Sequence, residues 1–375
     1  MDQSKCFLES KVNRFESHFC CSNSWLAVAA FSLFLAFSAV DARGSTLFLK
    51  TDATTRELAA NYSVVEVREA ISNCRNGKYP LGIPVLRQYA EEEDVAATYV
   101  LANLYYDGSG VEKSESLAIE MLGKNVAGDH APSMIRLGEI KEKESPVEAL
   151  QLYKRASAAN DAVGYLKLGD IFEKGSLGTR ANPKLAFKYF DKAHQAKHAM
   201  GTFHVARCYD VGVGVSPNSL ESTRLFRQAA LSGAGVANTV MARRYFEGKG
   251  VEADPVAAVG WLMRGARAGS TEAMVLLGQQ YESGDVMSKD INRAGQLYST
   301  ATKLNDPVGR YHLAMLYFNG IGTRRDPVRA YVLLDGAKGY PKAVEKLEEL
   351  SKSLSEEQIA LARKKIEEAE KRLKK

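Results

Sequence analysis

The chain has 375 residues, of which 45% are apolar and 25% are charged, and its formal net charge is +5. This balance is typical of chains that bury a core, and it excludes wholesale disorder. The charge is too small, and too evenly spread, to favour nucleic acid as a partner. Five cysteines and six histidines, widely scattered, are too few for a disulfide scaffold or a zinc-finger array.

The first feature along the chain is an uncharged run of 16 residues from Trp25 to Val40. Basic residues precede it, and Val40 and Ala42 stand at positions −3 and −1 of a potential cleavage site, as in secretory signals. The run is shorter than the ~20 residues that span a bilayer comfortably. We therefore predict a signal peptide, or an uncleaved signal-anchor, over 1–42 and a spacer over 43–62. The protein is expected in the periplasm or secreted, and it would contact the membrane only through an uncleaved N-terminal segment.

From residue 97 onward the sequence repeats itself. A large aliphatic residue followed by a small one returns seven times, at spacings of 36, 31, 37, 36, 36 and 36 residues. These small residues define position 0: Ala102, Gly138, Gly169, Ala206, Ala242, Gly278 and Ala314. Position −5 is also small in every unit: Ala97, Ser133, Gly164, Gly201, Ala237, Ala273 and Gly309. In six of the seven units position +3 is aromatic and position +6 is glycine.

Each repeat has the pattern of a helix hairpin. The small residues at −5 and 0 share one face of a first helix with bulky residues at −1 and +3. We expect a neighbouring helix to approach the small residues, and the aromatic residue at +3 to fill the gap beside them. Glycine at +6 suits the left-handed residue that ends a helix, and Pro255 suits the first turn of a second helix. A single hairpin cannot bury its apolar face, so we predict an all-α solenoid of stacked hairpins.

One unit carries a family pattern clearly. It reads Ala242-Arg-Arg-Tyr245-Phe-Glu-Gly248-Lys-Gly250-Val251-Glu-Ala-Asp254, followed by Ala258, Trp261 and Ala266. This unit resembles the Sel1-like repeat family, a relative of the tetratricopeptide repeats. The resemblance implies a right-handed α-solenoid of about seven to eight hairpins, with the main array over 97–342. It also implies a non-catalytic scaffold or adaptor that binds proteins in the bacterial cell envelope, in alginate-type exopolysaccharide production, export or its regulation.

The segments that flank the array are predicted to complete it. One repeat before Ala118 lies Gly82, so 63–96 is expected to form a degenerate first repeat. Ser355 to Gln358 has the pattern of a capping box that opens a final helix. We therefore predict capping helices over 343–375, which an open solenoid needs for solubility.

No motif supports catalysis or a cofactor. The Gly248-Lys-Gly250 loop resembles a dinucleotide loop, but it joins two predicted helices and not a strand and a helix. His194, His198 and His204 are close in sequence, yet no nearby carboxylate has the spacing of a metal ligand. We therefore predict a protein that is not an enzyme and that holds neither a metal nor a cofactor.

The variable positions −2 and +1 of the first helices are three residues apart and share one face. In the middle of the array this face is cationic, which suits an acidic segment of a protein partner. The predicted contact residues are Lys167, His204, Arg207, Arg243 and Arg244. Because Arg207 and Arg243 both occupy +1 in neighbouring units, we expect them side by side, with Arg244 close by.

An alternative is a glycan-binding or carbohydrate-active protein that uses the groove of the solenoid. It would need exposed aromatic platforms, and only Tyr106, Phe246 and Phe318, all at position +4, offer them. In the last two units the variable face turns apolar near Leu276 and Met315. That apolar face is a second place where a protein partner could bind.

Overall fold

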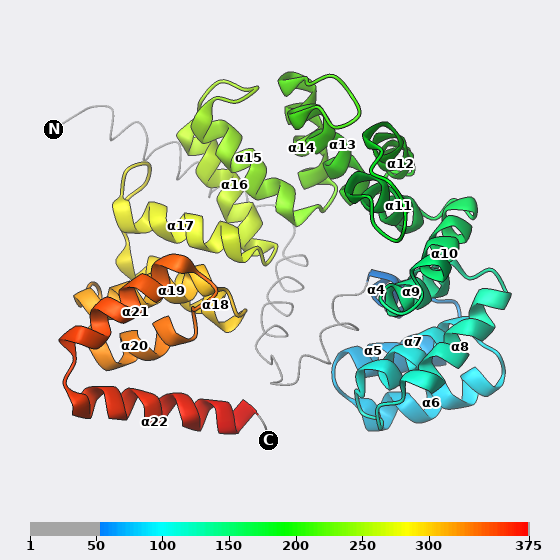
Figure 1. Ribbon diagram of the computed structural model, residues 1–375, viewed down its shortest axis with the longest axis horizontal. Coiled ribbons are helices and arrows are strands. Elements are labelled where there is room, and N and C mark those ends of the chain that lie inside the picture. Colours follow the sequence, from blue (N-terminus) through cyan, green and yellow to red (C-terminus); the bar gives the residue numbers. More distant parts are fainter. Residues whose placement is uncertain (1–52, 374–375) are drawn as a thin grey trace. The chain divides into compact units, whose positions relative to one another are not determined.

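The computed structural model describes residues 53–373, and all regular secondary structure in this range is α-helical (Figure 1). The described residues divide into an N-terminal unit, 53–218, and a C-terminal unit, 219–373. The predicted signal segment, 1–42, lies outside the described residues. So does most of the predicted spacer, whose end forms helix α4 (Ala53–Asn61).

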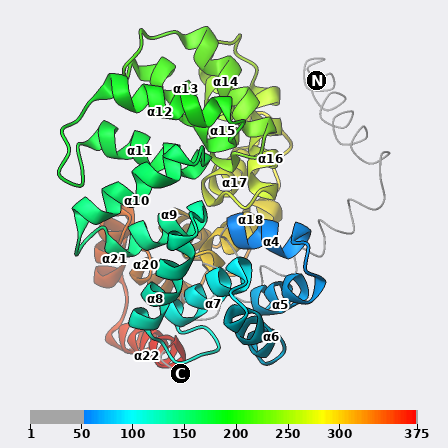
Figure 2. The same ribbon diagram turned by 90° about the vertical axis from the view of Figure 1, so that its right-hand side faces the viewer.

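The N-terminal unit contains α4 and nine further helices, which follow one another as hairpins (Figures 1 and 2). Their bounds are α5 (Val65–Arg75), α6 (Tyr79–Glu91), α7 (Val95–Asp107), α8 (Glu115–Ala127), α9 (Ala131–Lys141), α10 (Pro146–Ala158), α11 (Ala162–Lys174), α12 (Pro183–Gln195) and α13 (Ala199–Val211). Each helix packs against the next one along the chain. Helices α5 and α6 form a hairpin within 63–96, where the sequence predicts a degenerate first repeat.

The C-terminal unit is built in the same way. Its helices are α14 (Ser219–Leu231), α15 (Gly235–Glu247), α16 (Pro255–Arg267), α17 (Thr271–Ser283), α18 (Ile291–Lys303), α19 (Pro307–Asn319), α20 (Pro327–Asp335), α21 (Pro341–Ser353) and α22 (Glu356–Leu373). Helix α22 returns to pack on α20. The Ser355 hydroxyl oxygen accepts a hydrogen bond from the backbone N–H of Gln358 at 3.2 Å. In return, the side-chain oxygen of Gln358 accepts one from the backbone N–H of Ser355 at 3.1 Å. The predicted capping box is confirmed.

Among residues 53–373, no helix is both long enough and apolar enough to cross a membrane.

Local sequence explains where the helices begin and end. Helix α15 ends at Gly248, which adopts the left-handed conformation with φ 71° and donates its amide to the Arg244 carbonyl. Helix α16 begins after Asp254, whose carboxylate accepts from the amides of Val256 and Ala257 at 3.0 Å. The Asp254 carboxylate satisfies backbone amides that have no partner inside the helix, so it marks the start of α16. The left-handed Gly248, at position +6, marks the end of α15, as its position predicts.

The small residues at −5 let the preceding helix approach. A Cβ atom placed on Gly201 of α13 would lie 2.5 Å from the Ala193 carbonyl carbon and 2.7 Å from the Ala193 Cβ, both in α12. Gly309 of α19 meets Ala301 of α18 in the same way, at 2.6 Å. The prediction that −5 faces the neighbouring helix is confirmed.

The aromatic residue that fills the gap at position 0 is not the predicted one. A Cβ atom on Gly169 would lie 2.4 Å from the ring of Phe190, and one on Gly278 would lie 2.5 Å from the ring of Tyr298. Both rings come from the second helix of the same hairpin, because that helix crosses the first one at position 0. The aromatic residue at +3 lies beside this crossing; Phe172, for example, stacks on a neighbouring tyrosine and is only half-buried.

This packing predicts that position 0 and the ring above it compensate for each other. Gly278→Ala should cost ~1–3 kcal/mol because the new methyl group overlaps the Tyr298 ring. Tyr298→Leu should also destabilise, since it removes a fully buried ring and the hydroxyl that donates to Glu282 at 2.9 Å. The double variant recreates the Ala–Leu combination of Ala242 and Leu262. We expect it to recover at least ~1 kcal/mol relative to the sum of the single changes, measured as urea midpoints. Additive losses would contradict this packing.

Candidate protein-binding surfaces

On the predicted contact face, polar side chains pair between neighbouring repeats. Nε of Arg136, at −2 of the second repeat, donates to Oδ1 of Asn103, at +1 of the first, at 2.7 Å. Nζ of Lys167, at −2 of the third repeat, lies 2.7 Å from Oε1 of Glu139, at +1 of the second. Positions −2 and +1 do share one face, as predicted. There they join one repeat to the next.

His204 and Arg207 are also engaged within the N-terminal unit. The His204 ring stacks on Phe190 with a centroid distance of 4.5 Å. One Arg207 guanidinium nitrogen lies 3.4 Å from Nδ1 of His204, and the same nitrogen forms an ion pair with Glu173. Lys167, for its part, lies 5.6 Å from the centre of the Tyr153 ring. These three predicted contact residues therefore already have partners in the chain.

Arg243 is the most accessible of the predicted contact residues that form ion pairs. Its side chain is 57% exposed and pairs with Glu272 of the following repeat. Arg243 lies in the C-terminal unit and Arg207 in the N-terminal unit. The expected adjacency of the two arginines stays a prediction.

Arg244 does not lie on this surface. It is only 2% exposed, and its guanidinium donates to the hydroxyl oxygens of Thr223, at 2.6 Å, and Ser222, at 2.9 Å. The same group lies 5.0 Å from the centre of the Phe226 ring. Position +2 is rotated about 100° from +1 around a helix with 3.6 residues per turn, so Arg244 points into the contact with α14. The expectation that Arg244 meets a partner beside Arg243 is therefore wrong.

The aromatic residues at +4 are held by the chain's own cations. The Arg136 guanidinium lies 4.8 Å from the centre of the Tyr106 ring, and the Lys346 ammonium lies 4.8 Å from that of Phe318. Phe246 packs against the core of the C-terminal unit. None of the three rings stands out as an open platform for a sugar, so the structure adds no support to the glycan-binding alternative.

Within residues 53–373, no three His, Cys, Asp or Glu side chains are grouped as a metal site. Nδ1 of His194 lies 2.9 Å from the Thr202 hydroxyl. The Gly248-Lys-Gly250 loop joins α15 to α16, and a Cβ atom on Gly250 would lie 2.5 Å from the Ser219 carbonyl oxygen. This loop therefore packs against a helix of the preceding repeat.

Burial lowers the pKa of His312 from its ordinary value, although Glu282 opposes this effect. The ring stacks on Tyr298 at 5.0 Å, and its Nε2 lies 2.9 Å from Nε2 of Gln279. The pKa of His312 is thus lower in the folded protein than its value of about 6.5 in the unfolded chain. As the pH falls through about 6.5, His312 is protonated more readily in the unfolded chain, so the free energy of unfolding decreases. We expect the urea midpoint to decrease less between pH 7 and pH 5.5 in His312→Asn than in the wild type. A single histidine can contribute at most about 1.4 kcal/mol per pH unit. An equal decrease of the urea midpoint in the variant and the wild type would contradict the expectation.

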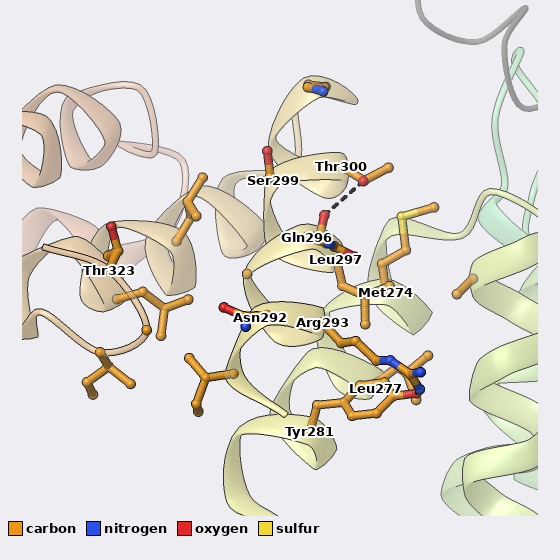
Figure 3. A pocket seen from close by; sticks show the side chains of 18 of the residues that line it. Met274, Leu277, Tyr281, Asn292, Arg293, Gln296, Leu297, Ser299, Thr300 and Thr323 are labelled. Atoms are coloured by element: carbon orange, nitrogen blue, oxygen red, sulfur yellow. Dashed lines mark hydrogen bonds between the residues drawn. The ribbon is translucent and has the colours of Figure 1, made fainter. Parts of the chain in front are cut away.

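A second surface surrounds α18 in the C-terminal unit. It is a depression of about 1010 Å³ that includes both flanks of this helix (Figure 3). On one flank Leu297 and Arg293 lie beside residues of α17; on the other, Asn292 faces the loop that carries Thr323. Gly295 of α18 also lines the depression, and its lack of a side chain leaves space there.

The lining of this depression combines apolar and basic side chains. Its large apolar members are Met263, Met274, Leu277, Ile291, Leu297, Leu313, Leu316 and Ile321. Its basic members are Arg267, Arg293, Lys303 and Arg329, and no acidic residue of the described chain lines it. This surface was not among the predicted ones, because the predicted contact positions −2 and +1 lie on first helices and α18 is a second helix. One signal was present: residues 291–303 contain basic but no acidic side chains.

Comparison with known proteins agrees with this architecture. The Sel1 repeat profile matches residues 95–124, 131–161, 162–198, 194–233, 236–270, 271–306 and 307–335, which together cover more than half of the chain. The chain therefore belongs to the Sel1 repeat family. The crystal structure of a Sel1 repeat protein from Oxalobacter formigenes is similar, with a TM-score of 0.53 and 25% identity, covering 63% of this chain and 96% of that one.

Several curated relatives have functional names, and two of them illustrate the range. Chitin synthase regulatory factor 3 of Schizosaccharomyces pombe is 26% identical over 211 residues, which are 53% of this chain and 23% of that protein. The alginate biosynthesis protein AlgK of Pseudomonas syringae pv. tomato is 34% identical over 129 residues, which are 34% of this chain and 27% of that protein. This chain thus spans about a quarter of the length of each of these relatives.

Proposed function

We propose that the protein is a non-catalytic scaffold that binds other proteins outside the cytoplasm and supports the production or export of a polysaccharide. The observation that carries the proposal is the array of seven Sel1 repeats, in which the residues at −2 and +1 join neighbouring repeats. Such an array forms an extended and stable surface, which suits simultaneous contact with several partners. The names of the relatives support the pathway, because chitin and alginate are both polysaccharides.

The location outside the cytoplasm is supported by the apolar run from Trp25 to Val40. We expect the mature protein to begin at Arg43 and to be absent from the cytosolic fraction. N-terminal sequencing of the native protein tests this directly. An intact Met1 in the cytosolic fraction would contradict the proposed location.

The scaffold function is tested by crosslinking in the cells that make the protein, followed by purification of the tagged full chain and mass spectrometry. We expect a polysaccharide synthase, an export component or a regulator of either to be enriched over a tagged protein of unrelated fold. Binding of the purified chain to alginate and chitin oligosaccharides is measured in parallel. Oligosaccharide binding without enrichment of any such protein would favour the glycan-binding alternative.

A further inference from the structure

We propose that the depression around α18 binds a segment of a protein partner that carries both acidic and apolar side chains. The inference rests on the proposed scaffold function and names the place and the chemistry of one contact. It differs from the sequence-based prediction, which placed the contact on the first helices around Arg207 and Arg243.

The first observation that favours an acidic segment is the presence of exposed basic side chains that have no carboxylate partner in the described part of the chain. Arg267 and Lys303 line the depression, both are exposed, and neither has an acidic partner among residues 53–373. On the first-helix face, in contrast, the basic side chains already meet carboxylates: Lys167 meets Glu139, and Arg243 meets Glu272. A carboxylate that arrives at α18 would therefore not have to displace an existing one from Arg267 or Lys303.

The other two basic side chains are positioned by neighbouring groups. Arg293 donates to the Tyr281 hydroxyl at 3.2 Å and lies 3.3 Å from an Asp290 carboxylate oxygen. The Arg329 guanidinium lies 4.2 Å from the centre of the Tyr317 ring. These contacts restrict both side chains, so a partner has less side-chain freedom to remove on binding. Fewer side chains to immobilise means a smaller entropic cost of association.

The apolar lining is the second observation. Met263 is a half-buried, flexible side chain that adapts to different shapes, and methionines are common on surfaces that bind peptides. Ile321, in the loop before α20, is 37% exposed, so apolar surface is open to solvent here. A partner residue such as leucine or phenylalanine would bury this surface, which a purely acidic segment could not do.

The size of the depression fits a peptide segment. Helix α18 has 13 residues and is therefore about 20 Å long, which matches about six residues of extended chain. A volume of about 1010 Å³ is at the upper end of the range for small-molecule pockets, roughly 300–1,000 Å³. A short segment that carries acidic and apolar side chains on the same face would place its carboxylates near the basic side chains and its apolar groups on Met263, Leu297 and Ile321.

The test uses peptides selected from a random 12-residue display library on the immobilised full chain. We expect the selected peptides to be enriched in Asp and Glu interspersed with Leu, Met and Phe. Their affinity should fall at least tenfold in Arg267→Glu/Lys303→Glu and should weaken as salt rises. A charge-matched control, Lys184→Glu/Lys188→Glu on the exposed side of α12, should bind like the wild type. Circular dichroism verifies that both variants keep their helix content.

Three outcomes would overturn the proposal. The first is a selection that gives no acidic peptides, and the second is equal binding by the wild type and by Arg267→Glu/Lys303→Glu. The third is a loss of binding in Arg207→Glu/Arg243→Glu alone, which would locate the contact on the first-helix face.

Crosslinking in cells separates this proposal from the scaffold function. A photo-crosslinking amino acid at Gln296, which lines the depression, should capture the acidic segment of the native partner. The same amino acid at the exposed Lys188 should not. If the wild type enriches a partner but position 296 does not crosslink to it, the docking site is wrong and the scaffold function stands. If no partner is enriched at all, the scaffold function itself fails.

Discussion

Replacing Gly201 by leucine should destabilise the N-terminal unit by about 3 kcal/mol. The introduced Cβ would lie 2.5 Å from the backbone of Ala193 and 2.7 Å from the amide nitrogen of His194. These are backbone atoms of α12, so the overlap cannot be relieved by a side-chain rotation and the two helices must separate. Overpacking of this kind costs ~1–3 kcal/mol, and the backbone contact favours the upper end.

The matched control is Gly123→Leu in α8, in the same unit. Gly123 is also helical, but a Cβ atom there would meet nothing within 4 Å. Leucine is a better helix former than glycine, so we expect the control to keep or raise the urea midpoint. Midpoints are followed by circular dichroism for both variants. Equal midpoints for Gly201→Leu and Gly123→Leu would show that position −5 does not pack as described.

Arg244→Ala should cost the C-terminal unit about 3 kcal/mol or more. The guanidinium is almost fully buried, and its donors hold the hydroxyl groups of Ser222 and Thr223 and, at 3.2 Å, the Lys249 carbonyl oxygen. Hydrogen bonds to a charged group contribute about 1.5–3 kcal/mol each, and their loss leaves buried acceptors without a partner. The truncation also leaves a cavity beside Phe226.

The neighbouring residue is the control for this change. Arg243 is 57% exposed and its ion pair with Glu272 is half-open to water, so Arg243→Ala should change stability by at most about 1 kcal/mol. Thermal and urea unfolding of both variants are compared with the wild type. If Arg244→Ala kept wild-type stability but lost a partner, Arg244 would be a contact residue after all and its buried position would be wrong.

Much of the fold could be predicted from the sequence because it depends on local and periodic signals. The glycine at +6 ends a first helix and Asp254 begins a second, and both effects act within a few residues of chain. The 36-residue spacing predicts stacked hairpins, since a hairpin that repeats must bury its apolar face on its own copies. The small residue at −5, such as Gly201, was also placed correctly, because its size matters only where a helix passes close to it.

Three features were decided by the tertiary structure. The ring that covers Gly278 comes from Tyr298, 20 residues away, and the crossing of the two helices selects it over Tyr281 at +3. Arg244 is one residue from exposed Arg243 yet is buried, because a rotation of about 100° turns it toward α14. The depression around α18 is lined by residues of α16, α17, α18, α19 and α20, which only the packing of these helices brings together.

The physical reason for this division is the range of the interactions. Helix ends, glycine conformations and repeat spacing are fixed by neighbours in the chain, and a sequence pattern records them directly. Whether a basic side chain such as Lys167 is paired, or one such as Lys303 is left without a carboxylate, depends on residues of other helices. The sequence therefore determined that this protein is a stack of helical hairpins, while only the packing of those hairpins decided which charges remain available to a partner.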